Sequence, residues 1–256
     1  DPPGLADSGE SILLVRAKDN AGNYSNEITF VFRYDGTPPA NPSSTIETHG
    51  VSNSTWTNQN NPSFTWSGAY ATSGIAGYNV YWGLSSLSTQ ATAFVTGEAY
   101  TPEPITTIVD GTYYLRVQTK DNAGNFAATY GTLFVYRFDS SSPAIGSPTI
   151  SIEEGSANMV FEAENHTLFY SAQSSGAVSI GATITDYYSG ADRMEFPAMF
   201  GETAATVTAS PFTKRYPITG AESSVGAYRL TGFDQAGNSA QSTALILIKD
   251  LSEPVM

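Results

Sequence analysis

The sequence has no cysteine and little positive charge. Its 256 residues hold 11 Lys and Arg against 24 Asp and Glu, a formal net charge of −13. Without cysteine there are no disulfides, thiolate zinc sites, iron–sulfur clusters or cysteine nucleophiles. The acidic balance argues against nucleic acid as a partner, since phosphate binding depends on clusters of Lys and Arg. No apolar run approaches the ~20 residues that cross a bilayer, so no membrane span is expected.

Charge of either sign is sparse, and small polar and aromatic residues take its place. Only 14% of residues are charged, whereas the chain has 23 Gly, 14 Pro, 15 Tyr and 13 Phe. This mixture favours short strands and tight turns over helices and is too aromatic for a disordered chain. No long stretch keeps the apolar spacing of a helix, so we predict an all-β protein. The chain starts at Asp1 without Met, which fits a processed or internal piece of a longer protein.

One motif occurs three times at a domain-sized interval. The letters D-N-A-G-N, or D-Q-A-G-N in the third copy, begin at Asp19, Asp121 and Asp234, with intervals of 102 and 113 residues. A second aspartate follows each motif after 16, 18 and 16 residues, at Asp35, Asp139 and Asp250. About 100 residues is the size of one β-sandwich domain. The chain is therefore expected to be a tandem array.

Apolar residues alternate on both sides of each motif. Leu13 and Val15 precede the first turn, and Phe30 and Phe32 follow it. A period of two is typical of a strand with one buried face, and Asp, Asn and Gly are turn residues. We therefore interpret each motif as a hairpin made by the last two strands of a domain. Upstream, a Ser-Gly turn at Ser73 and again at Ser189 leads into another strand of each complete domain.

The predicted fold is a series of immunoglobulin-like antiparallel β-sandwiches joined by short Pro-containing linkers. The complete sandwiches are expected at 38–141 and 142–253, with 254–256 beginning a further linker or repeat. Residues 1–37 then form only the last hairpin of a repeat. Because a lone hairpin is marginal in water, its missing strands lie upstream in a longer array or come from another chain. The first explanation is favoured because strand pairing between chains is less common.

The D-N-A-G-N hairpin followed by Asp-Gly-Thr-Pro-Pro resembles the immunoglobulin-like repeats of large secreted bacterial surface proteins and adhesins. The middle repeat, with NPSFTWSG and GTYYLRVQTKDNAGN, resembles a fibronectin-type-III-like variant of them. The resemblance covers nearly the whole chain. It implies a non-catalytic extracellular module of a stalk, surface filament or adhesin. Implied partners are neighbouring repeats, self-assembling chains and cell-surface glycans.

The resemblance also implies Ca²⁺ at domain junctions, held by acidic residues of the hairpin turn and the linker. The pairs carried over are Asp19 with Asp35, Asp121 with Asp139, and Asp234 with Asp250. Ca²⁺ takes six to eight oxygen ligands, partly from carboxylates. The simpler interpretation is that each Asp accepts backbone N–H groups of its own turn, which needs no metal.

Other candidate sites have plainer explanations. His49 and His166 are the only histidines and lie in different predicted domains, so no catalytic set is expected. The alternative function is a carbohydrate-binding or docking accessory of a secreted enzyme, which needs exposed aromatic side chains. Trp56 and Tyr81 are the candidates for that role, whereas Trp66 is expected in the core. Tyr113 fits a tyrosine corner, whose hydroxyl bonds back to the backbone.

Overall fold

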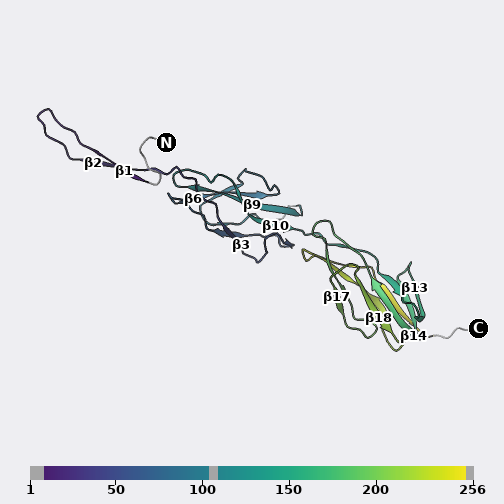
Figure 1. Cartoon of the computed structure of the whole chain (residues 1–256). Coiled ribbons are helices and arrows are strands. Elements are labelled where there is room, and N and C mark those ends of the chain that lie inside the picture. The colour runs from purple at the N-terminus through teal and green to yellow at the C-terminus, as the bar shows by residue number, and fades with distance from the viewer. Residues whose placement is uncertain (1–8, 104–108, 252–256) are drawn as a thin grey trace, which may run out of the picture. The chain divides into compact units, whose positions relative to one another are not determined.

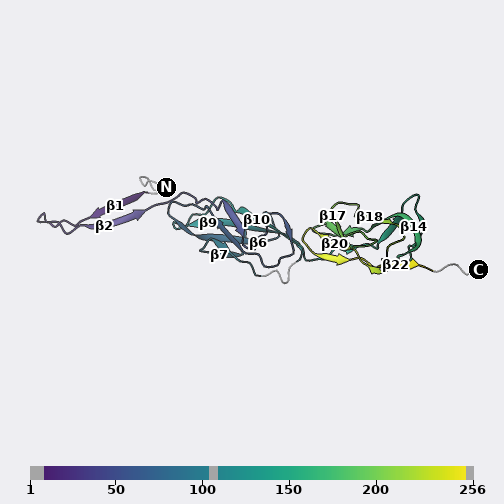
Figure 2. The ribbon, with the colours of Figure 1, turned by 90° about the horizontal axis from the view of Figure 1, so that it is seen from below.

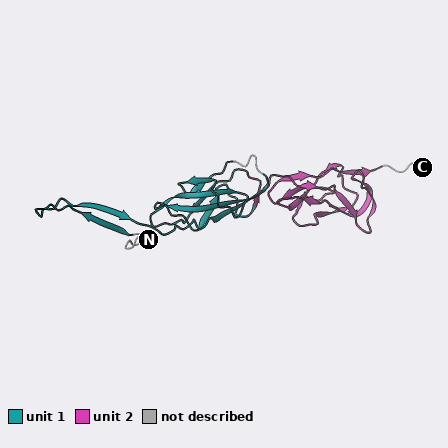
Figure 3. Ribbon diagram, turned by 90° about the horizontal axis from the view of Figure 1, so that it is seen from above, with its two compact units in different colours: residues 1–55, 60–137 teal, residues 56–59, 138–256 magenta. Residues whose placement is uncertain are grey.

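The computed structural model describes residues 9–103 and 109–251, and every regular element in them is a β-strand (Figure 1). The predicted all-β class is therefore confirmed. In this part of the chain, no helix is long and apolar enough to cross a membrane. The contacts divide the chain into two compact units, which Figure 3 colours separately. Unit 1 holds residues 1–55 and 60–137, and unit 2 holds residues 56–59 and 138–256.

Unit 1 begins with the predicted hairpin. Strands β1 (Glu10–Val15) and β2 (Ile28–Arg33) pair antiparallel and form a two-stranded sheet of their own (Figure 2). Leu13 lies opposite Phe30, so both side chains share one face of the hairpin. The predicted opening of a further repeat at 254–256 lies outside the described residues.

Two further sheets form the sandwich of unit 1. The first contains β10-β9-β6-β7 in that order, and the second is β3-β5-β8. Their bounds are β3 (Ser44–Glu47), β5 (Phe64–Ser67), β6 (Ile75–Gly83), β7 (Ala93–Val95), β8 (Ala99–Tyr100), β9 (Gly111–Asp121) and β10 (Gly131–Phe138). The Phe64 ring of one sheet lies 5.3 Å from Trp82 and 5.2 Å from Phe134 of the other. Aromatic contacts thus join the two layers.

Two core predictions in unit 1 are confirmed. Trp66 is 4% exposed and meets the ring of Tyr78 edge-on at 5.3 Å. The Tyr113 hydroxyl donates to the carbonyl of Val109 at 2.9 Å, which is the bond of a tyrosine corner. Burial raises the pKa of Tyr113, so the hydroxyl stays protonated as a donor.

Unit 2 has the same kind of core between larger sheets. One sheet runs β12-β14-β22-β19, with β13 and β18 also paired to β14, and a second runs β17-β16-β20-β21. The strands are β4 (Trp56–Thr57), β11 (Ala144–Ile145), β12 (Thr149–Ile152), β13 (Ala157–Glu162), β14 (Thr167–Gly181), β15 (Ile184–Thr185), β16 (Ala191–Phe196), β17 (Ala205–Val207), β18 (Thr213–Ile218), β19 (Gly226–Tyr228), β20 (Thr231–Asp234), β21 (Ser239–Gln241) and β22 (Leu245–Asp250). Ile180, Met194 and Leu245, from three of these strands, are all 0% exposed.

Unit 2 departs from the expected pattern in two ways. Strands β14 and β22 pair in parallel, whereas only antiparallel pairing was predicted. The strand expected before the third turn is also broken, because β19 pairs with β22 and β20 pairs with β16. The chain changes sheets at Leu230, whose amide donates to the hydroxyl of Ser242. A strand that passes from one sheet to the other keeps the same alternation of apolar residues as a continuous strand. The alternation therefore does not reveal the break.

Candidate functional site

The D-N-A-G-N turn has the same geometry in all three copies. In the first copy the Asp19 carboxylate accepts the Asn23 backbone N–H at 2.8 Å and its side-chain amide at 2.9 Å. The Asp121–Asn125 and Asp234–Asn238 pairs repeat both bonds at the same distances. A glycine with φ between 94° and 99° closes each turn, a conformation that favours glycine. The motif letters are thus explained by the turn itself.

In unit 1 this turn also binds the linker aspartate that precedes the sandwich. The Asn125 side-chain amide donates to the Asp35 backbone carbonyl at 2.8 Å, in addition to its bond with Asp121. The Asp35 carboxylate accepts the N–H of Ser73 at 2.9 Å, from the Ser-Gly loop, and of Thr37 at 3.0 Å. We call Asp35, Ser73, Asp121 and Asn125 the first clamp.

Unit 2 contains the equivalent set of bonds. The Asn238 side-chain amide donates to the Asp139 carbonyl at 2.9 Å, and the Asp139 carboxylate accepts the Ser189 N–H at 3.1 Å. The Ser141 N–H adds a bond at 3.0 Å. Asp139, Ser189, Asp234 and Asn238 form the second clamp. In each unit, therefore, the linker aspartate that precedes a sandwich is a structural part of that sandwich.

A backbone bond completes each clamp and explains one departure from the motif. The N–H of Asn122 donates to the Gly74 carbonyl at 3.0 Å, and the N–H of Gln235 donates to the Gly190 carbonyl at the same distance. Because this contact uses the main chain, Gln235 replaces Asn without losing it.

The structure groups the aspartates differently from the pairs that the resemblance implies. In the β1–β2 register, Glu10 lies opposite Arg33 at one end and Val15 opposite Ile28 at the other. Asp19, beyond Val15, and Asp35, beyond Arg33, therefore lie at opposite ends of the same hairpin. Each linker aspartate instead meets the turn of the following repeat, so that Asp35 groups with Asp121 and Asp139 with Asp234. Asp19 and Asp250 are exposed and belong to neither clamp.

The second clamp differs from the first by a third carboxylate. Oxygen atoms of Asp139, Asp186 and Asp234 lie within 4.8 Å of one another. Asp139 and Asp234 are 0% and 1% exposed. Asp186 lies in the Ser-Gly loop, where it accepts the backbone N–H of Ser189 and Gly190 at 2.9 and 2.8 Å. In unit 1 the position of Asp186, three residues before the Ser-Gly turn, is occupied by Tyr70, so the first clamp has no such charge.

Crowding of these carboxylates has an electrostatic consequence. Burial raises the pKa of Asp234, and the negative charges of Asp139 and Asp186 raise it further, against the lowering effect of the Asn238 bonds. The exposed Asp19 makes the same turn bonds, and there the Asn23 side-chain amide holds its pKa below the usual value. The second clamp thus gathers negative charge that the protein only partly compensates. Three close carboxylates and nearby carbonyls are the oxygen ligands that Ca²⁺ takes.

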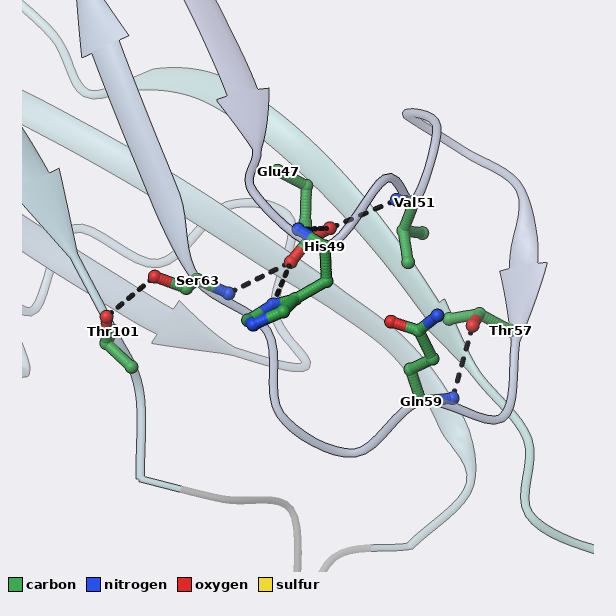
Figure 4. Close-up of polar contacts among 7 residues, drawn as sticks. All are labelled: Glu47, His49, Val51, Thr57, Gln59, Ser63 and Thr101. Atoms are coloured by element: carbon green, nitrogen blue, oxygen red, sulfur yellow. Dashed lines mark hydrogen bonds and ion pairs between the residues drawn. The ribbon is translucent and has the colours of Figure 1, made fainter.

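Glu47, at the end of β3, is a buried carboxylate that the sequence did not single out (Figure 4). It accepts the backbone N–H of His49, Val51 and Ser63 at 2.8 to 3.1 Å, and the His49 ring lies 3.1 Å away. Burial alone would raise its pKa, but these bonds hold the pKa below its usual value. Its role is to organise the loop after β3. In the same figure the Thr57 hydroxyl accepts the Gln59 N–H at 3.1 Å.

Trp56 and Tyr81 are the side chains that the sequence offers as an aromatic platform. Both side chains are half-buried, and the Tyr81 hydroxyl accepts the N–H of Ser85 at 2.9 Å. Tyr187 is 89% exposed, but its ring stands at 87° to that of Tyr188. These two rings do not form the flat surface on which a sugar stacks.

No protein-family model matches this chain, and no curated protein matches it. Among solved structures it is similar to the fibronectin(III)-like modules of Clostridium thermocellum CbhA, at 13% identity over 81% of this chain and 93% of that chain, with a TM-score of 0.39. The FN1–FN3 domains of chicken CNTN1 match at 13% identity over 90% and 73% of the two chains, with a TM-score of 0.42.

A bacterial protein is among the matching structures. It is described as a 1.5-MDa bacterial ice-binding adhesin and matches at 15% identity over 96% of this chain and 76% of that chain, with a TM-score of 0.40. The chain is thus similar to fibronectin-type-III-like modules and bacterial adhesin repeats, the kinds of module that its three D-N-A-G-N hairpins resemble.

Proposed function

We propose that the chain is a non-catalytic structural segment of an extracellular repeat array, acting as a stalk, surface filament or adhesin spacer on a bacterial surface. The observation that carries this proposal is the clamp, which occurs twice with the same bonds. A clamp of this kind performs no chemistry on a substrate. It uses the linker before a sandwich as part of that sandwich, which is what a chain of sandwiches needs in order to limit bending.

The length of free linker supports this role. Strand β10 ends at Phe138, and the next residue, Asp139, is already hydrogen-bonded within unit 2. The last strand of one repeat is therefore followed directly by a residue of the next clamp. The prolines that follow the linker aspartates stiffen the chain further, and the acidic surface keeps a long array soluble.

We propose that the second clamp binds a divalent cation, with Ca²⁺ the best match to its oxygen ligands. Asp139, Asp186 and Asp234 would hold it, and a cation would offset both the burial and the mutual repulsion that raise the pKa of Asp234. The first clamp has only two of the three carboxylates and serves as the internal comparison. Calcium binding would make the junction stiffer outside the cell, where the ion is abundant.

The spacer role is tested by pulling single molecules from both ends. We expect two main unfolding events, one for each unit, and expect Asn125→Ala and Asn238→Ala each to lower the unfolding force of their own unit. Asn23→Ala, which alters the same turn outside either clamp, serves as the control. Unfolding forces that the two clamp variants leave unchanged would contradict the proposal.

A further inference from the structure

The N-terminal hairpin carries an apolar face that the described residues leave exposed. Leu13, Val15, Phe30 and Phe32 lie on one face of β1 and β2 and are 44–50% exposed. On that face, the cross-strand pairs from Ser11–Phe32 to Val15–Ile28 include no charged side chain. Such a two-stranded sheet does not bury enough surface to be stable by itself.

The complete repeats show what the same face contacts when it is covered. Counted from the turn and linker aspartates, the four residues correspond to Leu115, Val117, Phe134 and Tyr136, which are 0–3% exposed in unit 1. There, Phe134 and Tyr136 meet the ring of Phe64 on β5, at 5.2 and 6.2 Å. The third repeat places Leu230, Leu245 and Leu247 at equivalent positions, and all are 0–1% exposed. The cover in both cases is the opening half of the same repeat.

The hairpin turn indicates the same kind of occupant independently. Asp19 and Asn23 keep the two bonds that Asp121–Asn125 and Asp234–Asn238 use when they hold a linker. In those two copies the Asn side-chain amide also donates to the carbonyl of the preceding linker aspartate. The turn of the hairpin is therefore already arranged as the receiving part of a clamp.

We infer that residues 9–34 are the closing half of a repeat, an inference that rests on the proposed array. The missing half consists of opening strands of the kind found at residues 38–103, preceded by an aspartate linker. The opening strands in this chain are already used, since Phe64 and Trp66 are 0% and 4% exposed in their own sandwich. A second copy of the chain has its own strands engaged in the same way. The occupant is thus the opening half of a further repeat, which pairs with the outer edge of β1 and covers Leu13, Val15, Phe30 and Phe32.

A grafted chain tests this inference. Residues 35–110 are duplicated and joined directly before Gly9, which stands at the position of Gly111 at the start of β9. Hydrogen exchange of the β1 amides and binding of an apolar dye are measured in this chain and in the original. We expect the graft to slow exchange across Glu10–Val15 by at least about 100-fold, to abolish dye binding to the hairpin and to add a third unfolding transition.

Two matched pairs of substitutions identify the face that is covered. Leu13→Lys with Phe30→Lys changes a cross-strand pair on the face in question, and Ile12→Lys with Val31→Lys changes the adjacent pair on the other face. The first pair should remove the protection gained by the graft, and the second should retain most of it. Protection of the Asn23 side-chain amide in the grafted chain gives a readout that does not depend on the apolar face.

Three results would overturn the inference. One is a grafted chain with β1 amides as unprotected as in the original chain. Another is equal loss of protection from both Lys pairs. The third is an ungrafted chain that sediments as a dimer with its hairpin amides protected, which would make a second copy the occupant. None of these results concerns the clamp variants, so failure here is distinguishable from failure of the spacer role.

Discussion

The first and second clamps use the same set of hydrogen bonds but differ in charge. In both, an Asn side chain joins the turn aspartate to the carbonyl of the preceding linker aspartate, whose carboxylate accepts an N–H of the Ser-Gly loop. Asp186 adds a third carboxylate to the second clamp only. The first clamp makes the shared bonds without a third carboxylate, so Asp186 is not required to build a linker into a sandwich.

The largest effects are expected from the Asn residue at the centre of each clamp. Asn125→Ala and Asn238→Ala each remove one bond to the turn aspartate and one to the linker carbonyl, leaving buried acceptors without donors. We expect a loss of about 2 to 3 kcal/mol in the free energy of unfolding of the altered unit, measured by denaturant titration.

The control for this pair is Asn23→Ala. Its side chain bonds Asp19 at the same distance but holds no described linker carbonyl, so we expect each unit to change by less than about 0.5 kcal/mol. If Asn23→Ala destabilises the chain as much as Asn238→Ala, the turn rather than the clamp carries the stability.

The next largest effect is expected from calcium, which should stabilise the unit with the second clamp and not the unit with the first. Extracellular modules bind Ca²⁺ with a Kd of roughly 10⁻⁴ to 10⁻³ M, so 10 mM ion should stabilise unit 2 by about 2 kcal/mol. Unit 1, with two carboxylates at its clamp, should not respond. Calorimetry of the chain with CaCl₂ and with EDTA measures both transitions. Equal responses of the two units, or no response from either, would contradict calcium binding at the second clamp.

Asp186→Asn is expected to have the smallest effect and tests the origin of the charge crowding. Asn retains an oxygen to accept the loop N–H groups, and loss of the negative charge should lower the pKa of Asp234 toward 3.8. A raised carboxyl pKa favours the protonated folded state, so the cost of the Asp234 charge is present at neutral pH and is relieved as the pH falls through the raised pKa. Without calcium, the variant should therefore equal or exceed the wild type at pH 7, by less than about 1 kcal/mol.

The matching measurement is a carbon NMR titration of the Asp234 carboxyl. Glu164→Gln removes one charge from an exposed site of the same unit and should leave that titration unchanged. An Asp234 pKa that is equal in the wild type and in Asp186→Asn would mean that burial and Asp139 raise it without a contribution from Asp186.

The sequence predicted those features of the fold that side-chain patterns specify. Alternation before the D-N-A-G-N turn, as at Leu115 and Val117, identified a strand with one buried face, and the position of Tyr113 near the start of that strand identified a tyrosine corner. It did not predict the parallel pairing of β14 with β22, since apolar alternation is the same for either direction of the partner. It also missed the crossing of the chain between sheets at Leu230, where the apolar pattern continues unbroken.

The sequence also identified only part of the candidate site. The turn and linker aspartates were identified, but they were paired within a repeat, although a hairpin places its turn and the linker that follows it at opposite ends. The linker aspartates instead bond through their own backbone carbonyls to the turn asparagines, and through their carboxylates to backbone N–H groups. Contacts that use the main chain leave no trace in residue type. Asp186 and Glu47 lie outside the repeated motif, and only the fold brings them to their partners.

The clamp is tested most directly by hydrogen exchange at the backbone amides of Ser73 and Ser189, which donate to Asp35 and Asp139. We expect both amides to be protected in the wild type. Asp35→Ala should accelerate exchange at Ser73 alone, and Asp139→Ala should accelerate exchange at Ser189 alone, less strongly because Asp186 also accepts that N–H. Exchange at both amides in the wild type as fast as in an exposed loop would show that the linker aspartates are not part of the sandwiches they precede.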